Sequence, residues 1–180
     1  MPKKMRTGGC FFFAVLLVAV LGYFLARPLL VVESGQGMIY VGEARMGQPI
    51  RIRFIHSVQK TPVEEDLRVD ERVEGFVLEA TRYQSFGVGL PFLENEGRFH
   101  AEGDYFVLED MGRRFPRLSL RTGVGTELVL TVDGEEKRLY ESLAPGSRID
   151  IYIAPVWRWG MKKLLGETVQ ENLPGPIGKE

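Results

Sequence analysis

The sequence has few residues of the kinds that build disulfides and metal centres. Cys10 is the single cysteine, so no disulfide can form within the chain. The only histidines are His56 and His100, and no cysteine follows Cys10. A zinc site needs roughly three or four protein ligands. We therefore expect no metal and no other cofactor.

Acidic residues outnumber basic residues after the N-terminus. Lys3, Lys4, Arg6 and Arg27 all precede the first acid, Glu33. The rest of the chain therefore holds 19 of the 23 Lys and Arg residues and all 24 Asp and Glu residues. A mildly acidic body lacks the basic face that nucleic-acid binding requires, so we expect no nucleic-acid partner.

Long helical periods are also missing after Gln36. Short segments alternate apolar and polar residues instead, with Gly, Pro and Asp between them, and Asp133-Gly134 is a strong hairpin-turn signal. Turns recur about every 10 residues, which is typical of antiparallel sheets. The pattern predicts an all-β domain over 33–156, either an antiparallel β-sandwich or a small barrel.

One long apolar run is present near the N-terminus. The basic stretch 1–9 precedes an uncharged run from Cys10 to Ala26, and the apolar stretch Leu29–Val32 extends it. We predict a signal anchor, a single transmembrane helix over 10–32, with the N-terminus in the cytoplasm. The chain would then be a single-pass protein of the cell membrane with an extracytoplasmic body. A cleaved signal peptide is the alternative, but Phe24-Leu25-Ala26 is a poor cleavage site.

The segment 157–180 ends in a Pro- and Gly-rich tail and begins with a short helical candidate. Trp157, Trp159 and Lys162-Lys163 mix aromatic and basic residues there. One interpretation is an interfacial segment that rests on lipid headgroups. The other is a surface turn of helix, which Gly160 and Gly166 favour because they interrupt any amphipathic face.

The stretch 54–69, FIHSVQKTPVEEDLRV, reads as two strands around a turn. If 59–62 is the loop, His56 faces Glu65 and both lie on the inward face of the hairpin. Such a pair is either a device that sets the register, a ligand site, or a general base oriented by a carboxylate. No nucleophile or metal set accompanies the pair, so we do not expect an enzyme.

The stretch 82–92, RYQSFGVGLPF, also places polar residues near the end of a predicted strand. Gly87 and Gly89 allow close backbone approach, either to an anion or at a simple bend. Arg82 shares parity with Phe76 and Leu78, which predicts that Arg82 points inward. These observations suggest one polar cluster, with candidate ligand-binding residues His56, Ser57, Thr61, Glu65, Arg82, Ser85, Gly87 and Gly89.

At these residues the sequence resembles the domain of unknown function 1850. The resemblance rests on HSVQKTPVEE (56–65) and YQSFGVGLP (83–91) and covers roughly 30–155. The matching positions are His56, Ser57, Thr61, Pro62, Glu65, Ser85, Phe86, Gly87, Gly89 and Pro91.

The resemblance implies an extracytoplasmic accessory role. Members are often encoded beside tripartite ATP-independent periplasmic transporters of the type with TAXI solute-binding proteins. We therefore expect a membrane-anchored accessory or binding protein whose partner is the TAXI-type solute-binding protein or the transporter's membrane subunits. The alternative is a small hydrolase or isomerase that uses His56 oriented by Glu65.

Overall fold

The computed structural model describes residues 7–84 and 97–165, those of 7–10 by their backbone alone. Residues 28–154 form one compact unit. The described residues before Pro28 and after Ala154 form a second unit, and each unit is considered by itself.

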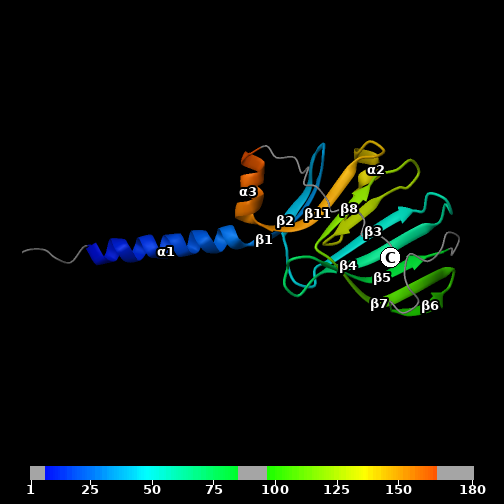
Figure 1. Ribbon diagram of the computed structural model, residues 1–180, viewed down its shortest axis with the longest axis horizontal. Coiled ribbons are helices and arrows are strands. Elements are labelled where there is room, and N and C mark those ends of the chain that lie inside the picture. The colour runs from blue at the N-terminus through cyan, green and yellow to red at the C-terminus, as the bar shows by residue number, and fades with distance from the viewer. Residues whose placement is uncertain (1–6, 85–96, 166–180) are drawn as a thin grey trace, which may run out of the picture. The chain divides into compact units, whose positions relative to one another are not determined.

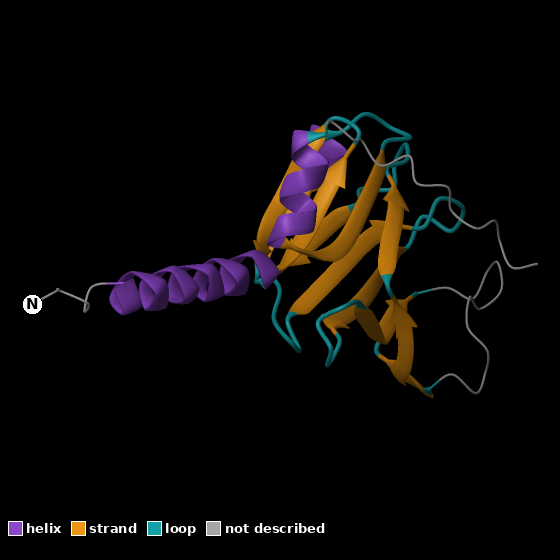
Figure 2. Cartoon of the chain, turned by 60° about the vertical axis from the view of Figure 1, so that its left-hand side comes forward, coloured by secondary structure: helices purple, strands orange, loops and turns teal. Residues whose placement is uncertain are grey.

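Strands are the main regular structure of the described residues in 28–154 (Figures 1 and 2), and the predicted antiparallel all-β class is confirmed. One sheet has four strands, in the spatial order β2 (Gly37–Glu43), β1 (Pro28–Ser34), β11 (Arg148–Pro155) and β8 (Arg117–Arg121). The other has seven, in the order β10 (Glu135–Arg138), β9 (Val129–Val132), β3 (Pro49–Ile55), β4 (Pro62–Val69), β5 (Phe76–Tyr83), β7 (Tyr105–Phe115) and β6 (Arg98–Glu102). A short helix, α2 (Leu139–Ser142), follows β10.

A single hydrophobic core joins the two sheets in a sandwich-like arrangement. Leu30 and Ile151 of the four-stranded sheet and Ile52, Phe76 and Leu130 of the seven-stranded sheet are at most 2% exposed and belong to one cluster. The alternation of apolar residues along these strands places them all on the inward faces. The pattern read from the sequence therefore corresponds to the buried side of each sheet.

The start of the domain differs from the prediction. We expected Leu29–Val32 to prolong a membrane helix over 10–32 and the domain to begin at residue 33. Instead the first helix ends at Ala26, and Leu30, Val31 and Val32 lie in β1 with no exposed surface. A short apolar run is compatible with a helix or a buried strand, and here pairing with β2 and β11 decides for the strand.

The second unit contains two helices, α1 (Thr7–Ala26) and α3 (Val156–Leu164). Across the described residues, neither of them is long and apolar enough to cross a lipid bilayer. The described side chains of α1, from Phe11 onward, are exposed, with Phe11 at 73% and Leu17 at 69%.

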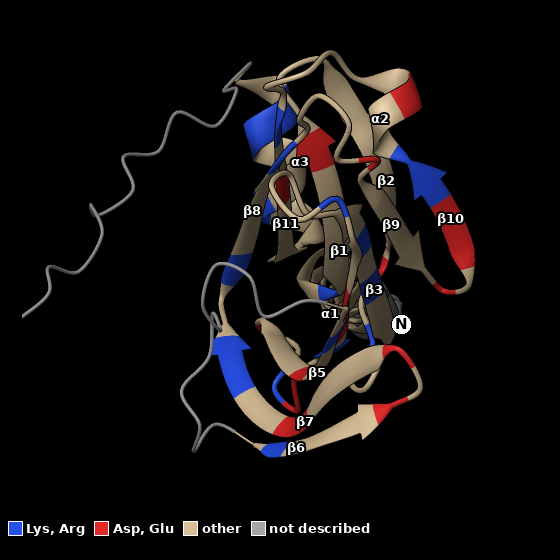
Figure 3. Ribbon diagram, turned by 90° about the vertical axis from the view of Figure 1, so that its right-hand side faces the viewer, with Lys and Arg blue, Asp and Glu red and all other residues tan. Residues whose placement is uncertain are grey.

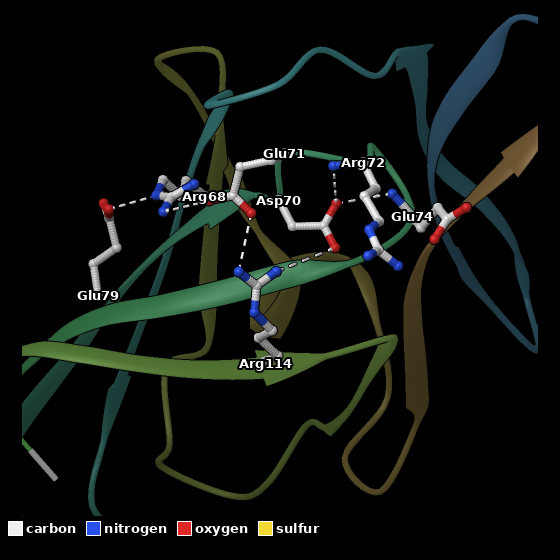
Figure 4. A network of polar contacts seen from close by, with 7 residues as sticks. All are labelled: Arg68, Asp70, Glu71, Arg72, Glu74, Glu79 and Arg114. Atoms are coloured by element: carbon white, nitrogen blue, oxygen red, sulfur yellow. Dashed lines mark hydrogen bonds and ion pairs between the residues drawn. The ribbon is translucent and has the colours of Figure 1, made fainter.

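Charged residues hold the turn between β4 and β5 (Figure 4). Arg68 pairs with Glu79 at 2.6 Å and with Glu71 at 3.1 Å, and Arg114 of β7 reaches Glu71 at 3.0 Å. The backbone amide of Glu71 and these two arginines lower the pKa of its carboxyl to about 2. Asp70 accepts hydrogen bonds from the amides of Arg72 and Glu74, and Val73 of the same turn packs against the hydrophobic core.

Candidate functional site

The hairpin of β3 and β4 is shorter than predicted, and its loop runs from His56 to Thr61. Phe54 lies opposite Val63 and Ile52 lies opposite Glu65. The predicted loop 59–62 and the predicted facing of His56 and Glu65 are therefore wrong. Because the two registers differ by an even number of residues, the same residues still share the inward face, which is why the pattern alone did not reveal the error.

His56 lies beyond the end of β3 and organises the loop. Its imidazole Nδ1 accepts hydrogen bonds from the amides of Val58 and Gln59, at 3.3 and 3.2 Å. Its own amide donates to the carbonyl of Thr61, and its carbonyl accepts from the amide of Lys60, both at 2.9 Å. Lys60 has φ 58°, a left-handed conformation. His56 is therefore a loop-closing residue in the manner of an Asx turn.

Substituting His56 should test this role. His56→Ala removes both hydrogen bonds to Nδ1 and should destabilise the fold by about 1 kcal/mol. His56→Asn retains a side-chain acceptor near the same amides and should recover most of that loss. Thermal unfolding of the two variants beside wild type measures the difference. Equal losses for alanine and asparagine would contradict the loop-closing role.

Glu65 is a half-buried carboxyl on the inward side of β4. Its cross-strand neighbours are Ile52 on β3 and Thr81 on β5, and Thr81 is 1% exposed. Burial raises the pKa of Glu65, and the charge of Arg113 opposes that rise only in part. Within the described parts of the chain, the Glu65 carboxyl makes no hydrogen bond or ion pair. Ile52 and His56 are four residues apart, a rise of roughly 13 Å along a strand, so Glu65 does not orient the imidazole of His56.

The unpaired carboxyl should lower stability at neutral pH. The folded-state pKa of Glu65 is raised, so folding favours its protonated form, and that advantage disappears as pH rises through the folded pKa. Glu65→Gln should therefore raise the melting temperature at pH 7 by about 2–4 °C, as a change of ~1 kcal/mol does in a chain of this size. The gain should shrink as pH falls toward the ordinary value of 4.5.

Glu64→Gln is the matched control for Glu65→Gln. Glu64 precedes Glu65 on β4 and points to the opposite side of the sheet, across from Arg53 and Arg82. Its neutralisation should leave the melting temperature at pH 7 unchanged or lower it slightly. A loss of stability in Glu65→Gln at pH 7 would contradict the assignment of Glu65 as an uncompensated buried charge.

Aromatic rings gather farther along the same inward face. Tyr83 of β5 lies opposite Val63 and Phe106, and the rings of Tyr83 and Phe106 are 5.9 Å apart. Phe106 stacks on Phe99 of β6 at 6.0 Å. Phe99 remains 50% exposed, so this end of the sheet presents an aromatic surface, and two strands, β5 and β7, separate Phe99 from Glu65.

Arg82 does not join Glu65, and its predicted inward direction is wrong. Glu79 is an extra residue in β5: Leu67 lies opposite Leu78, and Asp66 lies opposite Ala80. Such a bulge reverses the parity of the residues that follow, so Thr81 and Tyr83 point inward and Arg82 points outward. Ser57 is exposed in the loop and Thr61 closes it, while Ser85, Gly87 and Gly89 lie outside the described residues.

On the outer face Arg82 belongs to a charge ladder that the sequence reasoning missed. Asp66 pairs with Arg82 on one side and with Arg51 on the other, the latter at 2.6 and 3.2 Å. Pairing of Arg51 with Asp66 follows directly from the true register, in which the two residues are opposite each other. The wrong loop length concealed this signal.

An open pocket of about 560 Å³ lies beside this ladder on the outer face of the seven-stranded sheet. It extends from β4 across β3 toward β10, whose first residues are acidic (Figure 3). Arg53 makes no hydrogen bond or ion pair to the described residues. The lining includes Arg51, Arg53, Asp66, Glu79, Thr131 and Glu136.

Comparison with known proteins gives one match. Residues 50–139 match the family model described as Domain of unknown function (DUF1850). The chain belongs to this family. The matched segment runs from β3 to β10. It contains the strands of the seven-stranded sheet, the loop that His56 closes, and Glu65 on β4. No curated protein and no solved structure matches the chain.

Proposed function

We propose that this DUF1850 protein is a membrane-anchored accessory protein of a TAXI-type tripartite ATP-independent transporter. Its β-domain binds the solute-binding protein or the transporter's membrane subunits on the extracytoplasmic side. The proposal rests first on membership of the family, since resemblance to its members implies this association. It rests also on the register of β3 and β4, in which His56 and Glu65 do not form a histidine–carboxylate pair. Without that pair, the hydrolase or isomerase alternative lacks its oriented base.

The observation that carries a binding role is the position of Glu65. Among the described residues the half-buried carboxyl of Glu65 has no hydrogen-bond or ion-pair partner, which costs stability, and such costs are concentrated at sites that bind or react. Glu65 also matches the family pattern, and the rings of Tyr83 and Phe106 lie farther along the same inward face. A cationic group of the partner that reaches this face would pair with Glu65 and remove the cost.

Recovery of partners from native membranes tests the proposal. The tagged chain, extracted in mild detergent, should bring down transporter components, and Glu65→Gln should reduce their yield. Glu136→Gln, a carboxylate on the outer face of β10, is the control and should leave the yield unchanged. If wild type recovers no transporter component, the accessory role is contradicted. Equal yields for wild type and Glu65→Gln would remove Glu65 from the contact.

We further propose that the N-terminal segment that contains α1 is the anchor, ending at Ala26 and so shorter than the 10–32 span expected from the sequence. The side chains before Phe11 belong to this segment and lie outside the described residues in which no spanning helix is found. Support comes from its exposed apolar side chains, which water solvates poorly, and from the basic stretch that precedes it. The chain should remain in the membrane pellet after alkaline carbonate washing. A reporter enzyme that is active only outside the cytoplasm should be active when it is fused to the C-terminus of the chain. Release into the wash or a cytoplasmic reporter signal would contradict the anchor or its direction.

The open pocket supports a second candidate function, the binding of a small zwitterion such as an amino acid. Arg53 could receive its carboxylate, whereas Arg51 is already paired with Asp66. The carboxylates of Glu64, Glu79 and Glu136 also line the pocket and could receive its ammonium group. A panel of dicarboxylates and amino acids, tested by thermal shift, should contain a compound that stabilises wild type but not Arg53→Gln. No stabilisation by any member of the panel would count against this candidate.

A further inference from the structure

Helix α3 exposes a row of large apolar side chains. Trp157, Met161, Leu164 and the following Leu165 are 47%, 52%, 88% and 66% exposed. Their spacing of three and four residues places them along one side of the helix, here named the α3 stripe. Apolar side chains gathered in this way usually mark a surface that another apolar phase covers.

The charged residues within α3 itself are all positive. Neither α3 nor α1 contains an acidic residue, and Lys162 and Lys163 lie in the last turn of α3. By helical spacing, Arg158 and Lys162 lie next to the stripe, whereas Lys163 lies on the opposite side. A surface that complements this helix therefore has an apolar interior and negative charge at its boundary with water. A bilayer with anionic headgroups has both properties.

Contacts with α1 place α3 at the end of the proposed anchor. The amide of Val156, the first residue of α3, donates a hydrogen bond of 3.0 Å to the carbonyl of Arg27. The Arg27 guanidinium lies 5.9 Å from the ring centre of Phe24, and the two helices contact each other. The uncharged length of α1 ends at this point and the first cation follows, which is the depth at which headgroups begin.

We propose that α3 lies on the lipid headgroup layer, with the α3 stripe in the interface and Arg158 and Lys162 on anionic headgroups. The inference rests on the proposed anchor and adds a second lipid contact to it. Trp157 would occupy the interfacial level that tryptophan prefers. Such a contact would hold the segment that follows β11 against the membrane.

The chain contains two tryptophans, and both are in α3, so selectively excited tryptophan fluorescence reports on this helix alone. Trp159→Phe leaves Trp157 as the single emitter. The full chain is reconstituted in phosphatidylcholine vesicles with and without phosphatidylglycerol, and with lipids brominated close to the headgroup. We expect Trp157 emission to shift to the blue, to be quenched by the brominated lipid, and to be quenched more in the anionic vesicles.

Paired substitutions separate the stripe from general attraction to the surface. Arg158→Gln should weaken the docking of α3 on anionic vesicles about fivefold, the contribution of one cation near such a surface. Lys163→Gln removes the same charge on the opposite side and should have a smaller effect. Met161→Gln with Leu164→Gln should abolish the blue shift of Trp157. Both residues are exposed, so their substitution removes no buried contact of α3.

Flotation of the same vesicles distinguishes the two proposals. If the chain floats with the vesicles but Trp157 is not quenched, the lipid contact of α3 is overturned and the anchor stands. If the chain does not float, the anchor fails and the inference fails with it.

Discussion

A chain that begins at Glu33 should fail to fold, whereas a chain that begins at Pro28 should fold without α1. The two differ only by Pro28–Val32, which the sequence assigned to the membrane and the structure assigns to β1. Leu30, Val31 and Val32 have no exposed surface. Burial of each such side chain contributes about 1.5–3 kcal/mol, so the three together approach the whole stability of a typical domain.

The position of β1 adds to this effect. It lies between β2 and β11, so its removal leaves both neighbours with unpaired backbone groups. Circular dichroism and thermal unfolding should show a cooperative transition for 28–180 and none for 33–180. Val32→Asp in the longer chain is the point-mutation counterpart and should also abolish the transition. A cooperative transition in 33–180 close to that of 28–180 would return 28–32 to the anchor.

Asp150→Asn should destabilise the domain by about 2–3 kcal/mol, which should lower its melting temperature by several degrees. The Asp150 side chain is 9% exposed and lies 3.0 Å from Arg148 and 3.4 Å from Arg117. It also accepts a hydrogen bond of 2.5 Å from Ser119. Neutralising Asp150 leaves two guanidinium groups without their anion, and their partial exposure reduces the cost below that of a fully buried pair.

The pH dependence of this variant has a definite sign. Burial alone would raise the pKa of Asp150, but the Ser119 hydroxyl and the two arginines outweigh it, so the pKa is lowered. The stabilisation is therefore present above the ordinary value of 3.8 and is lost as pH falls through the folded pKa. The difference in the free energy of unfolding between wild type and Asp150→Asn should be constant near neutral pH and should disappear only in strong acid.

Ser119→Ala is the control for Asp150→Asn. It removes the hydroxyl contact but keeps the carboxylate and both arginines, so the loss should be about 1 kcal/mol. A loss as large as that of Asp150→Asn would mean that the hydroxyl and not the charge holds the cluster. The two acids, Asp150 and Glu65, thus predict opposite trends with pH in the same domain.

The sequence by itself determined the class of the fold and the family. Alternation of apolar and polar residues is a local property that any two-sided sheet requires, so the strands after Gln36 could be read from the pattern. The conformational preference of Asp133-Gly134 is equally local, and β9 and β10 meet at that turn. Family membership rests on residues within the matched segment 50–139.

Only the tertiary structure decided which residues meet. The register of β3 and β4 depends on a loop closed by His56, and parity of the pattern is the same for the wrong and the right loop. The bulge at Glu79 sends Arg82 to the outer face, and no alternation signal marks an inserted residue. β1 is a strand because distant β11 pairs with it, and Ser119 meets Asp150 because β8 pairs with β11 on its other side. Contacts between segments far apart in the chain are set by packing, which local patterns do not encode.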